Sequence, residues 1–379
     1  MANPVRVEAV TTSRHQRDFF SLRRKIYHND PNVVYPLNAM ERKQLSPTEH
    51  PFFEHATREL FVCYRGKTPV GRIAAIKDNM HNEHHDDRVG FFGCFEAEDD
   101  QEIVDGLISA ASAWLVANGC DTIRGPVNPS MKSDFGVVVQ GNDDPPCIMM
   151  GYSHKRYEDQ LLNSGFKVAR TFYAFKFLSA DNEDSAPMWT RIASTQARIF
   201  KRYPQLSFRT VDPDNYEDTL RDINVLGNSV RSQGWGFVPL SENELIFMIK
   251  NLRRVIRFDL IHTAYWDDQL VGYVVSIPDV NWALKRTFGK WDWLRMIQLP
   301  GLIKSARRSR VIALGVDESF RKKGIGMLLI QKIIEQHDAF EEWEFSWVDS
   351  ENVKSIRAIA SSVPLIRNKS YRLYDKPIS

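Results

Sequence analysis

The residues best suited to chemistry are Arg321-Lys322-Lys323-Gly324-Ile325-Gly326, three cationic side chains followed by two closely spaced glycines. This loop follows an apolar stretch, VIALGVD, and opens a run with helical spacing. The first turn of a helix has backbone N–H groups without intrahelical partners, and its dipole end is positive. Glycines lack the Cβ atoms that would keep phosphate oxygens from the main chain. The pattern predicts a diphosphate site, and a glycine-containing turn with solvated basic residues is the plainer alternative.

The elements that would position this loop can be read from the same half of the chain. A predicted hairpin, LIHTAYWDDQLVGYVVSIPD, precedes the strand, and a second strand, EWEFSWV, follows the helix. The first half repeats this order with ELFVCYRGKTPVGRIAAIKD, VGFFGCFEA, a helix over about 100–118, and DTIRGPV. Both halves then have a short helix and a tyrosine-bearing strand pair. The repeat predicts two similar domains, and chance similarity between two mixed α/β domains is the alternative.

Residues 178–188 separate the two halves, because they lose the apolar pattern and carry acidic, Ser, Asn and Pro residues. We therefore expect domains at 1–183 and 184–379, which also suits a chain of 379 residues. The net charge of +2 offers no strong attraction for nucleic acid or an anionic membrane, and neither partner is expected. The four isolated cysteines and the lack of a signal peptide or membrane-spanning stretch predict a cytoplasmic protein. The oligomeric state stays open.

The loop and its surroundings resemble motif A of the GNAT superfamily, R/Q-x-x-G-x-G/A, and the order of elements matches that fold over about residues 190–379. The whole chain resembles a bacterial family of tandem GNAT-like proteins through FFEH, VGRIAAI, RVGFFGCFEA, RGPVNPS, PPCIMMGY, EFSWV and YRLYDKP. This resemblance implies an α/β fold of mixed α+β sheets. Each of its two GNAT-like domains would hold a mostly antiparallel, splayed sheet flanked by helices.

The resemblance also implies acetyl-CoA as cosubstrate, with no metal. The residues implied to contact pantetheine through the main chain are Leu314, Gly315 and Val316. Those implied to hold the diphosphate are Arg321, Lys322, Lys323, Gly324, Ile325, Gly326 and Met327. Asn352 matches the asparagine that commonly follows the next strand of the fold.

Two departures from the family pattern matter. The first half has FEAEDDQEIVDG where the loop should be, so we expect no CoA there, because its carboxylates would repel a diphosphate. In the second half, Ile359 replaces the tyrosine that many GNAT enzymes use as general acid. Tyr371, Tyr374 or water would then protonate the departing thiolate.

Acyl transfer to an amine needs a neutral nitrogen, so a base is expected, and Glu344 is the candidate. An exposed strand carboxylate is the plainer reading of that residue. Four further residues are candidates for binding the acceptor. Asn128 and Ser130 lie in the first-half insertion, for which a loop packed for structure alone is the alternative. Trp235 and Phe237 lie in a segment over the predicted acceptor site, and core packing is the alternative for them.

Two other segments have plain readings that we prefer. The histidines of MHNEHHDDR are interpreted as a solvated turn, without a metal. The aromatic insertion FGKWDWLRMIQLPGLIKSARR could be an amphipathic lid or a membrane-touching helix, but packing between the halves is simpler.

The sequence thus favours an N-acyltransferase that moves an acetyl group from acetyl-CoA to a small-molecule or peptide amine by direct attack in a ternary complex. Two alternatives remain. One is a non-enzymatic CoA-binding or sensing protein, and the other is a Fem-type transferase that draws its acyl group from aminoacyl-tRNA.

Overall fold

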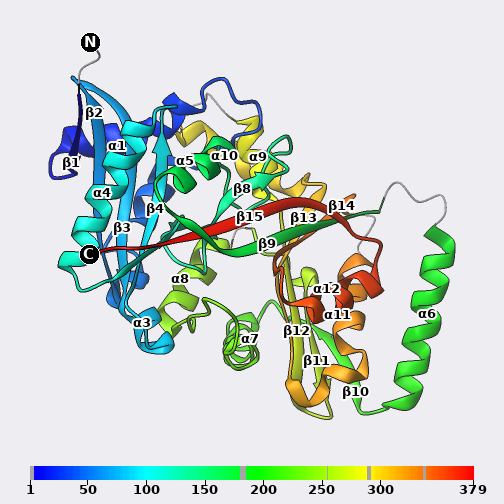
Figure 1. Ribbon diagram of the computed structural model, residues 1–379. Helices are drawn as coiled ribbons and strands as arrows, with labels where there is room; N and C mark the ends of the chain where they lie inside the picture. The colour runs from blue at the N-terminus through cyan, green and yellow to red at the C-terminus, as the bar shows by residue number, and fades with distance from the viewer. Residues whose placement is uncertain (1–3, 180–184, 254, 288–291, 336–338) are drawn as a thin grey trace. The chain divides into compact units, whose positions relative to one another are not determined.

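The computed structural model describes residues 4–179, 185–253, 255–287, 292–335 and 339–379 (Figure 1). The chain forms two compact units, the first made of Met1–Thr171 and Lys369–Ser379, and the second of Phe172–Asn368. The expected boundary at 183/184 lies outside the described residues. Neither unit is one consecutive half of the sequence. Most of the last strand, from Lys369 on, belongs to the first unit, and the strand residues from Phe172 on belong to the second. These strands pair with strands that are far away in the sequence.

The first unit is built around strands in the order β1-β2-β3-β4-β5-β15, with β8 also paired to β15. Only the β4–β5 pair is parallel. Its elements are β1 (Val5–Ala9), α1 (Ser13–Ile26), α2 (Asn38–Gln44), η1 (Pro51–Glu54), β2 (Ala56–Arg65), β3 (Thr68–Asp78), α3 (Asn79–His85), β4 (Val89–Ala97), α4 (Gln101–Ala117), β5 (Thr122–Gly125), β6 (Val127–Asn128), β7 (Asp134–Phe135), β8 (Val137–Gln140), α5 (Arg156–Asn163) and most of β15 (Ile366–Pro377). The short strands β6 and β7 form a separate pair.

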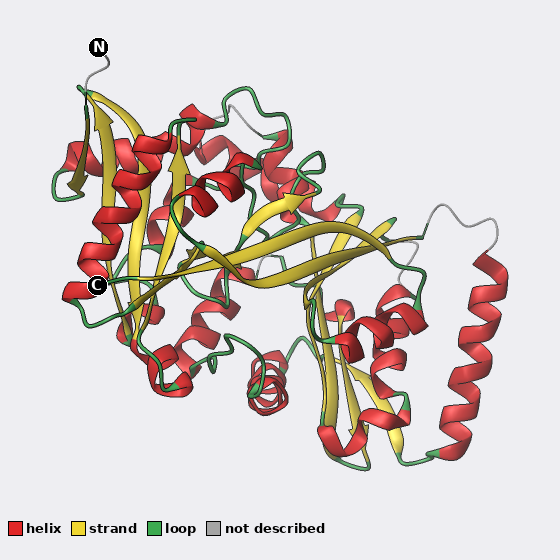
Figure 2. Ribbon diagram, viewed as in Figure 1, coloured by secondary structure: helices red, strands yellow, loops and turns green. Residues whose placement is uncertain are grey.

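The second unit has strands in the order β9-β14-β13-β12-β11-β10, and only β13 and β14 run parallel. Its elements are β9 (Lys167–Leu178, from Phe172 on), α6 (Ser185–Arg202), β10 (Leu206–Thr210), α7 (Tyr216–Arg231), α8 (Glu242–Leu252), η2 (Phe258–Leu260), β11 (Ile261–Trp266), β12 (Gln269–Pro278), α9 (Val280–Arg286), α10 (Asp292–Lys304), β13 (Arg308–Val316), η3 (Glu318–Lys323), α11 (Ile325–Ile334), β14 (Glu342–Asp349) and α12 (Val353–Ser362). In each unit, helices flank a mostly antiparallel sheet, which confirms the predicted fold class (Figure 2).

The second unit's sheet buries a separate core on each face. One core packs α11 against the sheet through wholly buried Ile325, Leu329 and Ile333, together with Trp343 of β14. The other core packs α7 and α8 against Tyr273 and its neighbours. Because side chains alternate along a strand, residues next to Trp343 on β14 face away from the α11 core.

The two parallel strands at the centre of each sheet separate along their length. In the second unit, β13 pairs with β14 only over residues 308–311, while its pairing with β12 continues to Val316. In the first unit, β4 pairs with β5 only over 89–91, while its pairing with β3 continues to Ala97. In both units, the last residue of the longer pairing faces a glycine on the neighbouring strand, Gly272 in the second unit and Gly71 in the first. The splay predicted by the resemblance is therefore present in both units.

Candidate functional site

The predicted diphosphate loop connects the end of β13 to α11 through the 3-10 turn η3. Gly324 has a φ of +84°, in the left-handed region that favours glycine, and it occupies the N-cap of α11. No side chain caps this helix. The main-chain N–H groups of its first turn, which have no intrahelical partners, are therefore not covered by a side-chain cap.

The two glycines of the loop have different surroundings. A Cβ atom on Gly324 would lie 2.6 Å from the Ile199 Cδ1 atom, so a side chain there would displace this methyl group, and the left-handed backbone angle favours glycine. A Cβ atom on Gly326 would meet only the Val316 Cγ2 atom, at an ordinary 3.6 Å. Space inside the protein therefore does not require glycine at residue 326, and approach of a ligand to the main chain would explain it.

The three cations of the loop lie at different depths. Arg321 is exposed, and its Nε atom donates to the Val316 carbonyl at 3.3 Å, which ties the loop to the end of β13. Lys322 is exposed. Lys323 is half-buried, with its Nζ atom 5.0 to 5.9 Å from the ring centres of Tyr203, Trp266 and Phe320. Together they supply positive charge beside the amides of α11.

The predicted pantetheine edge lies where β13 has separated from β14. Leu314, Gly315 and Val316 pair with Val274, Tyr273 and Gly272 of β12 on one side, and the β13–β14 ladder has already ended on the other. An extended chain can add to such an edge by main-chain hydrogen bonds. Ile325 is wholly buried, so only its main chain can take part in binding at the loop.

The corresponding edge of the first unit is already occupied by its own side chains. Ala97 matches Val316 in register, and its N–H donates to the Tyr157 Oη atom at 3.0 Å. Its carbonyl accepts from Arg156 Nη2 at 2.9 Å. The Cys94 N–H donates to the Asn128 side chain at 2.5 Å. These bonds leave less of the β4 edge open than of β13.

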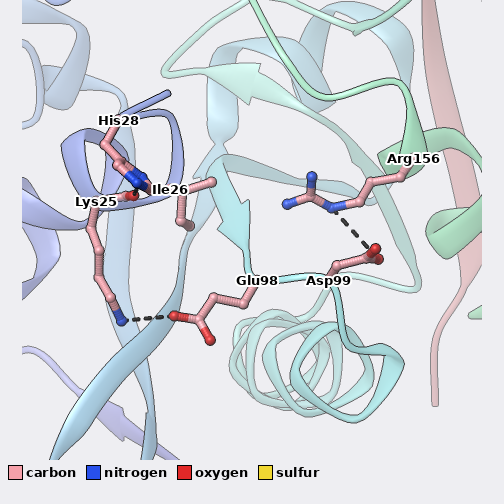
Figure 3. Close-up of a pocket in the computed structure, with 6 residues that line it drawn as sticks. All are labelled: Lys25, Ile26, His28, Glu98, Asp99 and Arg156. Atoms are coloured by element: carbon pink, nitrogen blue, oxygen red, sulfur yellow. Dashed lines mark hydrogen bonds and ion pairs between the residues drawn. The ribbon is translucent and has the colours of Figure 1, made fainter. Parts of the chain in front are cut away.

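The helix after β4 also differs from α11, because a carboxylate caps it. The Asp100 side chain accepts the Glu102 N–H at 2.9 Å, and Arg65 pairs with both carboxylates. A pocket of about 570 Å³ opens beside this turn (Figure 3), lined by Lys25, Ile26, His28, Glu98, Asp99 and Arg156. Within it, Lys25 pairs with Glu98 at 2.7 Å, and Arg156 lies 3.7 Å from Asp99. Lys25 and Arg156 are thus paired with carboxylates of the protein, which would also repel a diphosphate.

Glu344 is wholly buried, so it is not the exposed strand carboxylate of the plainer reading. Its Oε1 atom accepts a hydrogen bond from Ser346 Oγ at 2.9 Å. Ser346 Oγ in turn accepts from Arg310 Nε at 2.9 Å. Among the described residues, Glu344 Oε2 is buried and has no hydrogen-bond partner. A buried carboxylate oxygen without a partner can accept a proton from a ligand.

Sequence reasoning missed Arg310 and Tyr273. Arg310 is almost fully buried and is paired in register with Glu344. The ring of Tyr273 covers Gly315, since a Cβ atom on that glycine would lie 2.6 to 2.8 Å from Cε1, Cζ and Oη of the tyrosine. Tyr273 Oη has no hydrogen-bond partner in the described part of the chain, and burial raises the pKa of the phenol. Arg310 lies on β13 itself and Tyr273 on the neighbouring strand β12, and only these positions in the order of elements pointed to either residue.

The remaining second-unit candidates have local partners. Asn352 is exposed and caps α12 by accepting the Ser355 N–H at 3.0 Å. Ile359 is buried in the core beneath α11, so its side chain takes no part in proton transfer. Trp235 and Phe237 are half-buried, and Trp235 packs against Phe172 with ring centres 6.0 Å apart.

Four predicted site residues belong to the first unit, whereas the loop belongs to the second. Asn128 is engaged with the Cys94 N–H, and Ser130 Oγ accepts the Lys132 N–H at 3.3 Å. Tyr371 and Tyr374 are wholly buried on β15, and Tyr374 lies in the first unit's core. Neither unit by itself brings these four residues to the loop, so their roles stay predictions.

The histidine segment forms α3 and the turn after it, with His81 almost fully buried against Phe91. In the described residues, no group of three or more His, Cys, Asp or Glu side chains is placed to hold a metal ion. Burial, together with the nearby His85, lowers the pKa of His81 to about 3. Its ring Nε2 atom lies 3.5 Å from an Asp87 carboxylate oxygen. His81 is therefore neutral in the folded protein at neutral pH.

This burial predicts a pH dependence of stability. The unfolded chain protonates His81 below about pH 6.5, but the folded chain does so only near pH 3, so the free energy of unfolding should fall between these values. The contribution is up to about 1.4 kcal/mol per pH unit. Urea unfolding from pH 7 to pH 4 should show a shallower fall for His81→Phe than for wild type. Equal slopes would contradict the neutral, buried histidine.

Comparison with known proteins agrees with this geometry. The model of the acetyltransferase (GNAT) family matches residues 235–361, which include β13, the loop and α11. A bacterial ceramide synthase of Caulobacter vibrioides is 30% identical, over 97% of this chain and 96% of its own length. The chain belongs to the GNAT superfamily. Protein YghO of Escherichia coli is 25% identical, over 95% of this chain and 92% of its own.

The arrangement of two GNAT-like halves is also seen in a solved structure. A tandem GNAT protein from the clavulanic acid biosynthesis pathway has a TM-score of 0.56 at 10% identity, and the match covers 98% of each chain. At that identity the likeness concerns the fold alone. The predicted membership of a tandem GNAT-like family is confirmed, and acyl transfer is the reaction class that the family supports.

Proposed function

We propose that the protein is an acyl-CoA-dependent N-acyltransferase whose cosubstrate binds the second unit. The observation that carries the proposal is the open β13 edge leading to the α11 N-terminus, where no side chain supplies a cap. The first unit provides an internal comparison, because its β4 edge and α4 terminus already hold side-chain partners. A CoA thioester would supply the activated acyl group, with its diphosphate at residues 321–327 and its pantetheine arm along residues 314–316.

The chain's own groups would handle the protons. In the reaction a C–N bond forms, the C–S bond breaks, and the amine loses a proton while the thiolate gains one. Glu344 has a buried oxygen able to accept the amine proton, directly or through water, and Ser346 with Arg310 fixes its other oxygen. Tyr273, protonated at neutral pH because burial raises its pKa, is our proton donor in place of Tyr371 or Tyr374.

The acyl group is the finer part of the proposal. The sequence led us to expect acetyl, but the Caulobacter relative is named a ceramide synthase. A ceramide is the amide of a long-chain amino alcohol and a fatty acid. We therefore propose that this chain prefers a long-chain acyl-CoA to acetyl-CoA and a primary amine on an aliphatic amino alcohol as acceptor.

Release of free CoA thiol over a panel of acyl chain lengths and amines tests this function. We expect amine-dependent release that is greatest with long acyl chains and with long-chain amino alcohols. Greatest turnover with acetyl-CoA would restore the original expectation. Binding without turnover on any acceptor would favour a CoA sensor, and absence of CoA binding would favour the aminoacyl-tRNA-dependent alternative.

Tyr273→Phe should lower kcat by about 10- to 100-fold, because the variant lacks the proposed donor to the departing thiolate. Its stability should stay equal or rise, since the hydroxyl is buried without a hydrogen-bond partner. Steady-state kinetics and thermal unfolding of the same preparation measure both effects. Unchanged kcat would remove Tyr273 from the mechanism. Tyr216→Phe is a suitable control, because Tyr216 lies in the same core but its hydroxyl bonds Glu217.

A further inference from the structure

Helix α10 (Asp292–Lys304) carries exposed apolar side chains. Ten large apolar side chains are exposed among the described residues, and three of them lie on this helix within a stretch of five residues. Trp293 is 60% exposed, Met296 53% and Ile297 69%. Their spacing of three and four places them on one helix face. Pro300 and Gly301, one turn further on, are also exposed and extend this apolar stripe.

The buried residue of α10 is a charged one. Arg295 is only 1% exposed, and its Nε atom donates to Thr287 Oγ1 at 3.3 Å. The helix thus buries an arginine while tryptophan, methionine and isoleucine remain in water. Since burying such an apolar side chain is worth about 1.5 to 3 kcal/mol, an exposed stripe of three favours a second surface that covers it.

The segment that carries α10 is strongly basic, although the whole chain is not. Residues 280–308 hold seven Lys or Arg residues and one Asp, in a chain whose net charge is +2. Arg295 is buried, and Arg307 and Arg308 pair with Glu341 and Asp279, so the cations offered to a partner are the exposed ones. Lys304 is exposed at the end of the stripe, and Lys285 and Arg286 are exposed at the end of α9. Apolar and aromatic side chains bordered by cations suit an anionic lipid surface, where the rings enter the headgroup region and the cations meet phosphates.

The length and charge of α10 indicate which kind of surface would cover its apolar stripe. At 13 residues it is about 20 Å long, so it suits the membrane surface rather than its interior. Within the described part of the chain, no helix is long and apolar enough to cross a bilayer. A second copy packed stripe to stripe would bring two basic segments together, which is unfavourable.

We propose that α10 is a membrane-contact helix that docks the protein on an anionic bilayer through Trp293, Met296 and Ile297. This differs from the expectation of no membrane partner, and it takes up the membrane-touching interpretation of this insertion, which the sequence alone placed second to packing between the halves. The inference stands on α10 itself and does not require the proposed function. If both hold, the helix gives the enzyme access to an amine or acyl group carried by a lipid.

Co-sedimentation of the full chain with vesicles tests the proposal. Wild type should bind vesicles of phosphatidylcholine with 30% phosphatidylglycerol, bind pure phosphatidylcholine at least tenfold more weakly, and lose affinity as salt rises. The double variant Trp293→Ser/Ile297→Ser should bind at least tenfold more weakly, and Lys304→Glu several-fold. Val225→Ser on α7 is the matched control, because Val225 is 71% exposed but lies outside the stripe.

Three outcomes would overturn the proposal. The first is that wild type stays in the supernatant with anionic vesicles, and the second is that the double variant binds as tightly as wild type. The third is a dimer, seen by light scattering, that the double variant abolishes, because this would assign the stripe to a second copy. Acyl transfer measured without vesicles on a water-soluble amine reports on the proposed function separately. Thermal unfolding should show all variants folded, since the changed side chains are exposed.

Discussion

Glu344→Gln should lower kcat by about 10²- to 10⁴-fold while the dissociation constant for CoA stays unchanged. Glutamine keeps the shape of the side chain and can still accept a hydrogen bond from the Ser346 hydroxyl, but it cannot take a proton from the amine. The loss should shrink at high pH, where the amine is neutral in solution. Steady-state kinetics across pH, with calorimetry for CoA, measure both properties.

Glu342→Gln is the matched control for this variant, because Glu342 lies two residues earlier on β14 and pairs instead with Arg308. It should leave kcat within about threefold of wild type. A purely structural role of Glu344 would show as a lower unfolding temperature with normal kcat per folded molecule. That result would remove the base from the proposed mechanism.

Gly326→Leu should weaken CoA binding by about 100-fold or more, because its side chain would cover the amides at the start of α11. The protein should still fold. Only Val316 lies near a Cβ atom at this position, and replacing glycine in a helix is favourable by up to about 1 kcal/mol. Calorimetry with CoA and thermal unfolding give the two readings.

The neighbouring glycine would be a poor choice for this test. Gly324→Leu would clash with Ile199 and force a left-handed backbone on a branched residue, so lost binding would be confused with lost stability. Gly301→Leu on α10 is the better control, since nothing lies within 4 Å of a Cβ atom there. Undiminished CoA affinity in Gly326→Leu would place the diphosphate elsewhere.

Local patterns predicted the elements that surround the loop. The hairpins, the strand before residue 321 and the helix after it were all recognisable, because alternation and helical spacing are properties of short segments. The pairing of β14 with β9 and of β15 with β5 could not be predicted, since these strands are far apart in the sequence. For the same reason, the exchange of strands between the two compact units could not be predicted, and the division at 183/184 stays a prediction.

The chemistry of the site was only partly predictable. Glycines and cations mark an anion site by their types, so the loop could be found from the sequence. Alternation on β14 placed Glu344 and Ser346 on one face, but neither the burial of that face nor the bond from Arg310 on another strand could be read from the spacing. Likewise, the spacing of α10 shows an apolar face, but only its three-dimensional surroundings show that this face is exposed and that Arg295 is buried.

Hydrogen–deuterium exchange with and without CoA tests most directly the claim that the second unit alone holds the cosubstrate. Amides of residues 314–328, along the β13 edge and the start of α11, should exchange more slowly when CoA is bound. Residues 95–104, the corresponding segment of the first unit, should exchange at the same rate in both samples. Protection of the first-unit segment, with none in residues 314–328, would contradict the account.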